Sequence, residues 1–381
     1  MTRLVFAALL CITLPLVGSE TSFHDFFRSS MQRYGVVGGS VLVISNGRTS
    51  LREMYGDANR QLHQKVDENT TFHWASITKT FTGIAILQLR DHGLLQLDDP
   101  VVKYVPELRA IHDPFGPVEA VTIRQLMTHS AGFRSATWPW TSGHPWEPFE
   151  PAKWSQIVAM LPYTEILFKP GSKHSYSNLG VVFLGQIIER LSGDDYEVFI
   201  DKNILKPLGM FTSYFDRAPY YLLKHRAEGY YRANGVLQPA PFNFDSGITV
   251  SNSGLNAPLA DMARYLGFLL GSTNDPAILN RRSLEEMFQK QMPVEQTDAS
   301  QTASAGKDWI GLSFFIHEQN GRKYIGHGGQ QGGFISHFYA DPVHGNAYVA
   351  AFNTDSSDAA TNTHKLDGEL RDYLLGLFAR Q

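Results

Sequence analysis

The sequence predicts an α+β fold, in which an antiparallel β-sheet is flanked by helices and a mostly helical lobe is inserted into it. Strand-like segments lie near both ends of the chain and helical patterns lie between them, so the sheet must combine distant parts of the sequence. The chain has 381 residues, which suits one fold with two lobes. We expect a sheet lobe at about residues 20–75 and 300–381, and a helical lobe at about residues 76–299.

The composition excludes several functional classes. A formal net charge of -4 leaves no basic footprint for nucleic acid, so we expect no nucleic-acid partner. The chain has one Cys, Cys11, which excludes an internal disulfide, a Cys-rich zinc site and an iron–sulfur cluster.

Residues 1–19 are typical of a cleaved secretory signal peptide. A single positive charge at Arg3 precedes an apolar run over residues 4–17, and small residues lead to an expected cut after Ser19. The run is shorter than the roughly 20 residues that a membrane span needs, and no later stretch is long and apolar enough. We therefore expect a secreted or periplasmic protein without a membrane span, whose mature chain lacks Cys11.

The first third of the mature chain predicts a helix, a hairpin and a second helix. Apolar residues at helical spacing indicate a helix over residues 21–34. Two strand-like segments, residues 40–45 and 49–55, meet at Asn46-Gly47, a favoured two-residue hairpin turn. An apolar stripe then predicts a helix over residues 76–93.

The remainder predicts further helices and then a run of strands. Helical spacing indicates helices at residues 179–191, 257–270 and 283–290, and a last one at about residues 359–378. Residues 291–308 are polar and indicate a surface loop. Successive strands, with turn signals such as Asn320-Gly321 between them, are expected at residues 309–319, 322–327, 334–340 and 347–353.

The first candidate for chemistry is a Ser-x-x-Lys step, Ser76-Ile-Thr-Lys79, at the start of a predicted helix. Residues i and i+3 share a helix face, which would place Lys79 beside the Ser76 hydroxyl. A serine hydroxyl is a weak nucleophile and needs a base to take its proton. A second match, Ser304-Ala-Gly-Lys307, lies in the polar loop without an apolar helix after it, and we interpret it as chance.

Two further short motifs add polar groups to this step. In Tyr176-Ser177-Asn178 a phenol and an amide could relay a proton and bind a substrate carbonyl, although Ser177 or Asn178 could instead cap the next helix. In the segment from Gly326 to Phe334, dense glycines between strands indicate either close approach of a substrate backbone or a tight turn.

Taken in order, Ser76-x-x-Lys79, Tyr176-x-Asn178 and His327-Gly328-Gly329 resemble the serine β-lactamase and penicillin-binding-protein superfamily. The closest likeness is to its class C β-lactamase-like branch, peptidase family S12, in which the third motif can be His-x-Gly. The resemblance spans about residues 25–378 and extends to four framework segments, which are residues 93–100, 126–132, 207–210 and 261–264.

The resemblance implies roles for particular residues. Ser76 would be the acylated nucleophile, and Lys79 and Tyr176 would share the general-base role. Asn178 would bind the substrate amide, and the backbone N–H groups of Ser76 and Gln330 would form the oxyanion hole. Substrate binding would also involve His327, Gly328 and Gly329, with no metal and no cofactor.

The chain departs from β-lactamases at His327, where those enzymes usually carry Lys. A histidine with an unshifted pKa is only about 10% charged near neutral pH, so most of the fixed charge for a substrate carboxylate is lost. Gly328 also lacks the hydroxyl that the more usual Thr would offer to the substrate carboxylate, which argues against efficient β-lactam hydrolysis. The alternative is that His327 is only a turn residue.

These observations predict an exported serine hydrolase that acts on amide or ester bonds through a Ser acyl-enzyme. The expected substrate is a small molecule or a peptide, and we favour a D-amino-acid peptidase, of the DD-carboxypeptidase or D-aminopeptidase kind, or an esterase. One alternative is a class C-type β-lactamase, and another is a non-catalytic binding or scaffolding protein with the same fold.

A Pro- and Trp-rich segment, residues 134–151, indicates either a substrate lid or an internal aromatic cluster, and both remain open. The histidines His73, His129 and His174 lack zinc-protease spacing. A Gly-x-Ser-x-Gly elbow is absent as well, which argues against an α/β-hydrolase.

Overall fold

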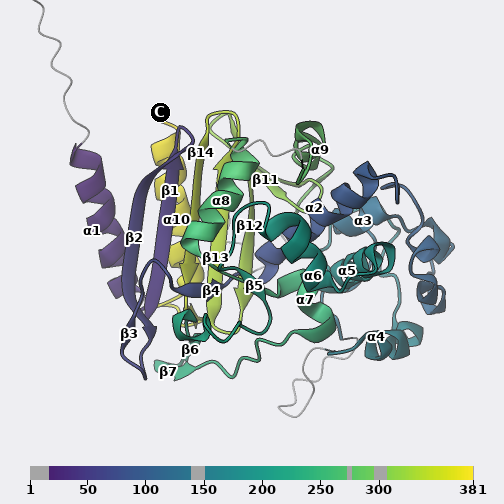
Figure 1. Cartoon of the computed structure of the whole chain (residues 1–381), viewed down its shortest axis with the longest axis horizontal. Coiled ribbons are helices and arrows are strands. Elements are labelled where there is room, and N and C mark those ends of the chain that lie inside the picture. Colours follow the sequence, from purple (N-terminus) through teal and green to yellow (C-terminus); the bar gives the residue numbers. More distant parts are fainter. Residues whose placement is uncertain (1–16, 139–150, 273–276, 296–306, 381) are drawn as a thin grey trace, which may run out of the picture.

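A computed structural model describes residues 17–138, 151–272, 277–295 and 307–380. Its centre is a nine-stranded antiparallel sheet in the order β3-β2-β1-β14-β13-β12-β11-β10-β9 (Figure 1). The strand bounds are β1 Gly38–Ser45, β2 Arg48–Asn59, β3 Gln64–Lys65, β9 Met292–Pro293, β10 Lys307–Ile310, β11 Phe315–Gln319, β12 Arg322–Gln331, β13 Phe334–Asp341 and β14 Asn346–Phe352.

The predicted discontinuous sheet is confirmed. The hairpin β1–β2 turns at Asn46-Gly47, and both residues have the positive φ that this turn requires, 51° and 73°. On its other side β1 pairs with β14, which places Gly39 opposite Phe352. The two ends of the described chain therefore meet in the middle of one sheet.

Helices cover both faces of the sheet. On one face, α1 (Val17–Arg33) and α10 (Thr363–Phe378) pack over a core that includes Phe27, Val41 and Leu370. On the other face, α8 (Leu259–Leu270) contacts β1, β13 and β14, within the larger of the two apolar clusters (Figure 1). Alternate residues of each strand therefore point into two separate cores, as a two-sided buried sheet requires.

The helical lobe is built around α2 (Thr78–Asp91), which is buried along almost its whole length. The other helices of this lobe are α3 Ile123–Met127, α4 Trp154–Met160, α5 Asn178–Ser192, α6 Tyr196–Ile200 and α7 Val250–Ser253, and α9 Arg281–Met287 packs on α2. Two small three-stranded sheets complete the fold, β4-β8-β5 (Thr71–His73, Leu255–Pro258, Tyr214–Phe215) and β15-β6-β7 (Thr354–Ser356, Tyr230–Ala233, Val236–Pro239).

Three predicted element boundaries differ in the structure. The segment 309–319 is two strands, because the chain reverses at Ser313, whose φ is 63°, and Gly311 N donates to Phe314 O. The last helix begins at Thr363, where the Asn362 side chain caps it. The chain also returns to the sheet before residue 300, since α8 lies on it and β9 belongs to it.

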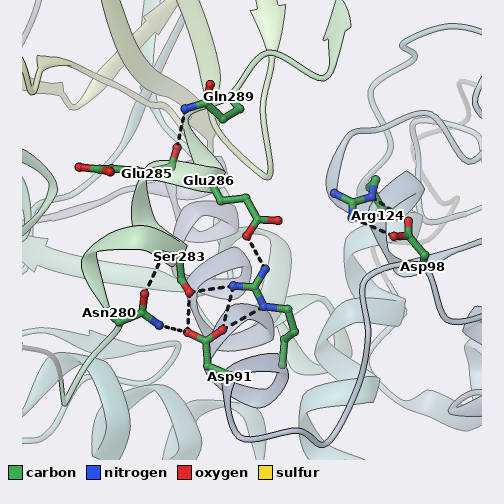
Figure 2. Close-up of polar contacts among 9 residues, drawn as sticks. Asp91, Asp98, Arg124, Asn280, Ser283, Glu285, Glu286 and Gln289 are labelled. Atoms are coloured by element: carbon green, nitrogen blue, oxygen red, sulfur yellow. Dashed lines mark hydrogen bonds and ion pairs between the residues drawn. The ribbon is translucent and has the colours of Figure 1, made fainter.

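The C-terminal end of α2 is tied to α9 by a polar network (Figure 2). The Arg90 guanidinium donates to Asp91, to Glu286 at 2.6 Å and to the Ser283 hydroxyl at 2.8 Å. Asp91 in turn accepts hydrogen bonds from Ser283 and Asn280. Among the described residues, no helix is both long and apolar enough to cross a membrane.

Candidate active site

Ser76 is presented by a sharp turn between β4 and α2. The turn is fixed from behind by β8, because Trp74 N donates to Leu255 O and the Trp74 indole N–H donates to Ala257 O, both at 2.9 Å. Ala75 has a left-handed φ of 46°, a strained conformation for a residue other than glycine. The turn leaves Ser76 on a single turn of 3₁₀-helix that runs into α2.

The structure brings Lys79 beside Ser76, as the i,i+3 spacing predicts. Lys79 Nζ donates to Ser76 Oγ at 2.9 Å and to the carbonyl of Asn252 in α7 at 2.8 Å. The Lys79 side chain is buried at 1% exposure, so these contacts hold an ammonium group away from bulk water. The Lys79 amine is thus in direct contact with the hydroxyl that would act as the nucleophile.

Tyr176 lies on the other side of the Ser76 hydroxyl. Its phenol shares a hydrogen bond with Ser76, and Lys79 Nζ lies 5.0 Å from the centre of its ring. Burial raises the pKa of Tyr176 well above its ordinary value, and the Ser76 contact offsets only part of that rise. The phenol therefore stays protonated at neutral pH.

The structure shows which of Ser177 and Asn178 caps the helix that follows them. Ser177 is the N-cap of α5, because its Oγ accepts from Gly180 N at 3.0 Å. The Asn178 side chain instead lines a cavity of about 390 Å³ that also contains Ser76 and Tyr176. Its Oδ1 atom is buried and has no hydrogen-bond partner among the described residues. Asn178 is thus placed to bind a polar group in the cavity.

The third motif lies on β12, at the edge of the same cavity. β11 pairs with β12 only as far as Gly326, so the next residues of β12 present an uncovered edge. Gly329 is required by packing, because a Cβ atom there would lie 2.2 Å from the Trp74 carbonyl. Gln330 lines the cavity, and its side chain donates to Asp355 at 2.8 Å.

His327 is buried and uncharged near neutral pH. Burial, together with the charge of Lys79, lowers the pKa of His327 to about 3. Its Nδ1 lies 2.6 Å from the Gly328 carbonyl, and its ring centre lies 6.4 Å from that of Tyr176. The residue is therefore part of the site rather than an exposed turn, and it brings no fixed positive charge.

Sequence reasoning missed His129 as a member of this site. Its ring packs 4.5 Å from that of Tyr176, and its Nδ1 accepts from Ser177 N at 3.2 Å. Burial, followed by the nearby charges of His174 and Lys79, lowers the pKa of His129 well below its ordinary value. The only sequence feature that could have indicated this role is its place in the framework segment 126–132, because the residues that it contacts are about 50 positions away.

Of the other residues that the sequence analysis considered, His174 and Ser135 line the same cavity, whereas His73 does not. His73 is held by Asn256 and Gln331, both at 3.0 Å, in a structural role. Across the described ranges, no cluster of three or more His, Cys, Asp or Glu side chains could hold a metal ion. Trp138 packs partly buried against the core, whereas residues 139–150 lie outside the described residues, as does Ser304.

Comparisons with known proteins find similar sequences in one family. A family model described as "Beta-lactamase" matches residues 23–370. "Protein flp" of Staphylococcus aureus (strain COL) is 31% identical over 212 residues, which cover 56% of this chain and 41% of that protein. A beta-lactamase of Pseudomonas fluorescens is 29% identical over 229 residues, 59% of either chain. The chain thus spans well under two thirds of these curated relatives.

Solved structures extend the likeness to almost the whole chain. The octameric penicillin-binding protein homologue from Pyrococcus abyssi superposes with a TM-score of 0.78 at 30% identity, covering 95% of this chain and 78% of that one. A class C beta-lactamase superposes with a TM-score of 0.71 at 22% identity, covering 92% and 97%, and supports the fold alone.

Proposed function

The chain belongs to the beta-lactamase family of serine hydrolases, and from that premise we propose that it forms an acyl-enzyme at Ser76 with D-amino-acid peptides or small esters as substrates. Membership of this enzyme family sets aside the non-catalytic alternative. The observation that carries the substrate class is His327, which is buried and neutral where a β-lactamase has a fixed cation. A substrate that needs no ion pair at this position is favoured.

In the proposed reaction, Ser76 Oγ attacks the substrate carbonyl while its proton moves to the Lys79–Tyr176 pair that it contacts. The negative charge on the carbonyl oxygen is stabilised by the backbone N–H groups of Ser76 and Gln330. The tetrahedral intermediate expels an amine or alcohol, which takes up the proton. A water molecule, deprotonated by the same pair, then attacks the ester and releases the acid and Ser76.

The proposal extends to where the protein acts. The basic, apolar and small-residue pattern of residues 1–19 supports export with cleavage after Ser19, giving a secreted or periplasmic enzyme. Mass spectrometry of the protein from an exporting host should show a mature N-terminus at Glu20. A full-length product retained with the cells would contradict this part.

Intact-mass measurement tests the nucleophile. Incubation with an activated ester or a fluorescent penicillin should add one acyl mass, and Ser76→Ala should give neither adduct nor turnover. An adduct that persists in Ser76→Ala would overturn the assignment.

Comparison of kcat/KM for a p-nitrophenyl ester, a D-Ala-D-Ala peptide and a cephalosporin ranks the substrates. We expect the ester, which carries no carboxylate, to exceed the cephalosporin. The reverse order would favour the class C-type β-lactamase alternative, which the fold also permits.

A further inference from the structure

Packing requires two of three glycines in β12 but not the third. At Gly326 a Cβ atom would lie 2.4 Å from the Phe338 carbonyl, and at Gly329 it would lie 2.2 Å from the Trp74 carbonyl. Neither position can carry a side chain. At Gly328 the nearest atom, the Ser336 carbonyl, is 3.8 Å away, which is an ordinary contact. Packing does not demand a glycine at position 328, so the space beside it is available to something else.

That space belongs to the catalytic cavity. The cavity that holds Ser76 also borders Gly328 and continues to side chains from β13 and α10. In the sheet register Gly328 lies opposite His337, and their side-chain positions share the face of the sheet that α10 covers. The walls of this chamber include His337, Tyr339, Asp367 and Arg371, with Asp308, His317 and His364 further along.

The chamber contains one unused hydrogen-bond acceptor. His337 Nδ1 pairs with Asp367 Oδ2 at 2.8 Å, but Asp367 Oδ1 is buried without a hydrogen-bond partner among the described residues. A buried polar atom of this kind is costly unless a ligand or water satisfies it. A ligand that fits here must donate a hydrogen bond to a carboxylate.

The charged side chains of the chamber also favour a ligand group that can donate to a carboxylate. Arg371 is the one side chain of this cavity wall that carries a permanent positive charge, and its Nε donates to Asp372 at 3.0 Å. Burial raises the pKa of the Tyr339 phenol; Arg371 offsets part of that rise, and Asp308 and Asp367 add to it. Leaving the histidines aside, two carboxylates, Asp308 and Asp367, stand against one guanidinium in this wall, which favours a positively charged group in the ligand.

We propose that Gly328 opens the catalytic cavity to this chamber, and that Asp367 there binds an ammonium group carried by the substrate at a distance from the scissile bond. This inference rests on the proposed acyl-enzyme chemistry at Ser76 and adds a substrate class to it. A side chain at position 328 would close the passage, and loss of the Asp367 charge would remove the recognition.

The test uses matched activated esters that differ only at one end, an amine against a methyl group, placed either on the acyl chain or on the leaving group. In the wild-type enzyme, kcat/KM should favour the amine by about tenfold in one of the two series, the worth of one charged hydrogen bond. Asp367→Asn and Gly328→Thr should each bring that ratio close to one. Asp372→Asn, at a residue that touches Arg371 from outside the cavity, should keep it.

The outcomes separate the two proposals. If no ester is turned over and no acyl group attaches to Ser76, the proposed function itself fails. If a short ester is turned over through Ser76 but the amine-to-methyl ratio is near one, only the chamber assignment is overturned. The same conclusion follows if the ratio survives both Asp367→Asn and Gly328→Ala, the second of which adds the smallest possible side chain.

Discussion

The two ends of α2 hold cations in different ways, a buried Lys79 and a partly buried Arg90. At the N-terminal end, Lys79 contacts neutral oxygens, the Ser76 hydroxyl and the Asn252 carbonyl. At the C-terminal end, Arg90 contacts the carboxylates of Asp91 and Glu286. The second arrangement joins two helices through carboxylates, whereas the first places an amine against a serine hydroxyl. One helix thus carries the proposed proton-transfer group at one end and a structural anchor at the other.

The helix itself strengthens this contrast. The N-terminal end of a helix carries a partial positive charge and the C-terminal end a partial negative charge, so a cation is favoured only at the second. Arg90 is therefore at the stabilising end, and Lys79 is at the end that disfavours its charge. A lysine kept there, buried, is placed for chemistry at the expense of stability.

The largest expected effect comes from Lys79→Met, which keeps the length of the side chain and removes its amine. Ester turnover should fall by about 10³-fold or more, because the proton of Ser76 loses its acceptor, a loss of about 4 kcal/mol in the barrier. Thermal unfolding should be little changed or shifted upward. If Lys79→Met lowered the stability of the fold but kept the activity per folded molecule, Lys79 would have a structural role and the proposed catalytic role would be wrong.

Arg90→Met should have the complementary effect. Removing the guanidinium leaves Asp91 and Glu286 facing each other without a cation, and we expect a loss of about 2 kcal/mol in the free energy of unfolding. The value of kcat/KM for the same ester should stay within about twofold, since Arg90 is at the far end of the helix. Denaturant titration and steady-state kinetics on one preparation measure both quantities.

Asp216→Asn tests the effect of a buried carboxyl group for which the described residues provide no ion-pair partner. Asp216 follows β5, is 6% exposed, and its pKa is raised to about 7, first by burial and then by Glu197. The folded state therefore keeps a proton that the unfolded state loses above about pH 4, so stability falls between pH 4 and 7. The variant should lack this fall and be more stable at pH 8 by about 2 kcal/mol. Parallel melting curves for both proteins at pH 5 and pH 8 would contradict it.

His327→Gln tests whether the neutral imidazole contributes to the pH dependence of catalysis. Because the pKa of His327 is lowered to about 3, the residue does not titrate between pH 5 and 8. The rate of the variant should change, but the shape of its pH profile in that range should match the wild type. Loss of an inflection near pH 6 would show that His327 ionises during turnover.

The smallest effect is expected for Asp98→Asn, in the exposed ion pair with Arg124 (Figure 2). The Asp98 side chain is 71% exposed, so solvent and salt screen the pair. The loss of stability should be under about 1 kcal/mol and should vanish at high salt. A loss as large as that of Arg90→Met would mean that burial does not decide the strength of these pairs.

Local sequence patterns were enough for the parts of the fold and site that local physics determines. The Asn46-Gly47 turn, the helix from Ser76 and the contact of Lys79 with Ser76 all follow from residues within a few positions of each other. The break at Ser313 was not predicted. Gly311 and Ser313 interrupt the apolar pattern there, but the reversal also depends on contacts with the ends of two distant helices, because Leu312 N donates to Met287 O in α9 and Ser313 N donates to Met127 O in α3.

Long-range contacts account for what the sequence could not provide. His129 meets Tyr176 only in the folded chain, and the space beside Gly328 is visible only when the neighbouring strand is in place. The sequence indicates that position 328 is a glycine, but it does not distinguish a glycine required by packing from one that leaves an opening. That distinction separates Gly328 from Gly326 and Gly329.

The pairing of β1 with β14 has a consequence for how the protein folds. β1 gains its second neighbouring strand only when β14, which contains Phe352, has been synthesised. The sheet of a nascent chain therefore stays incomplete until almost the whole chain has been made. Contacts between residues so far apart close a very large loop, which makes folding slow and leaves β1 open to pairing with other chains in the meantime. Truncation before residue 346 should therefore yield an aggregating product rather than a smaller stable domain.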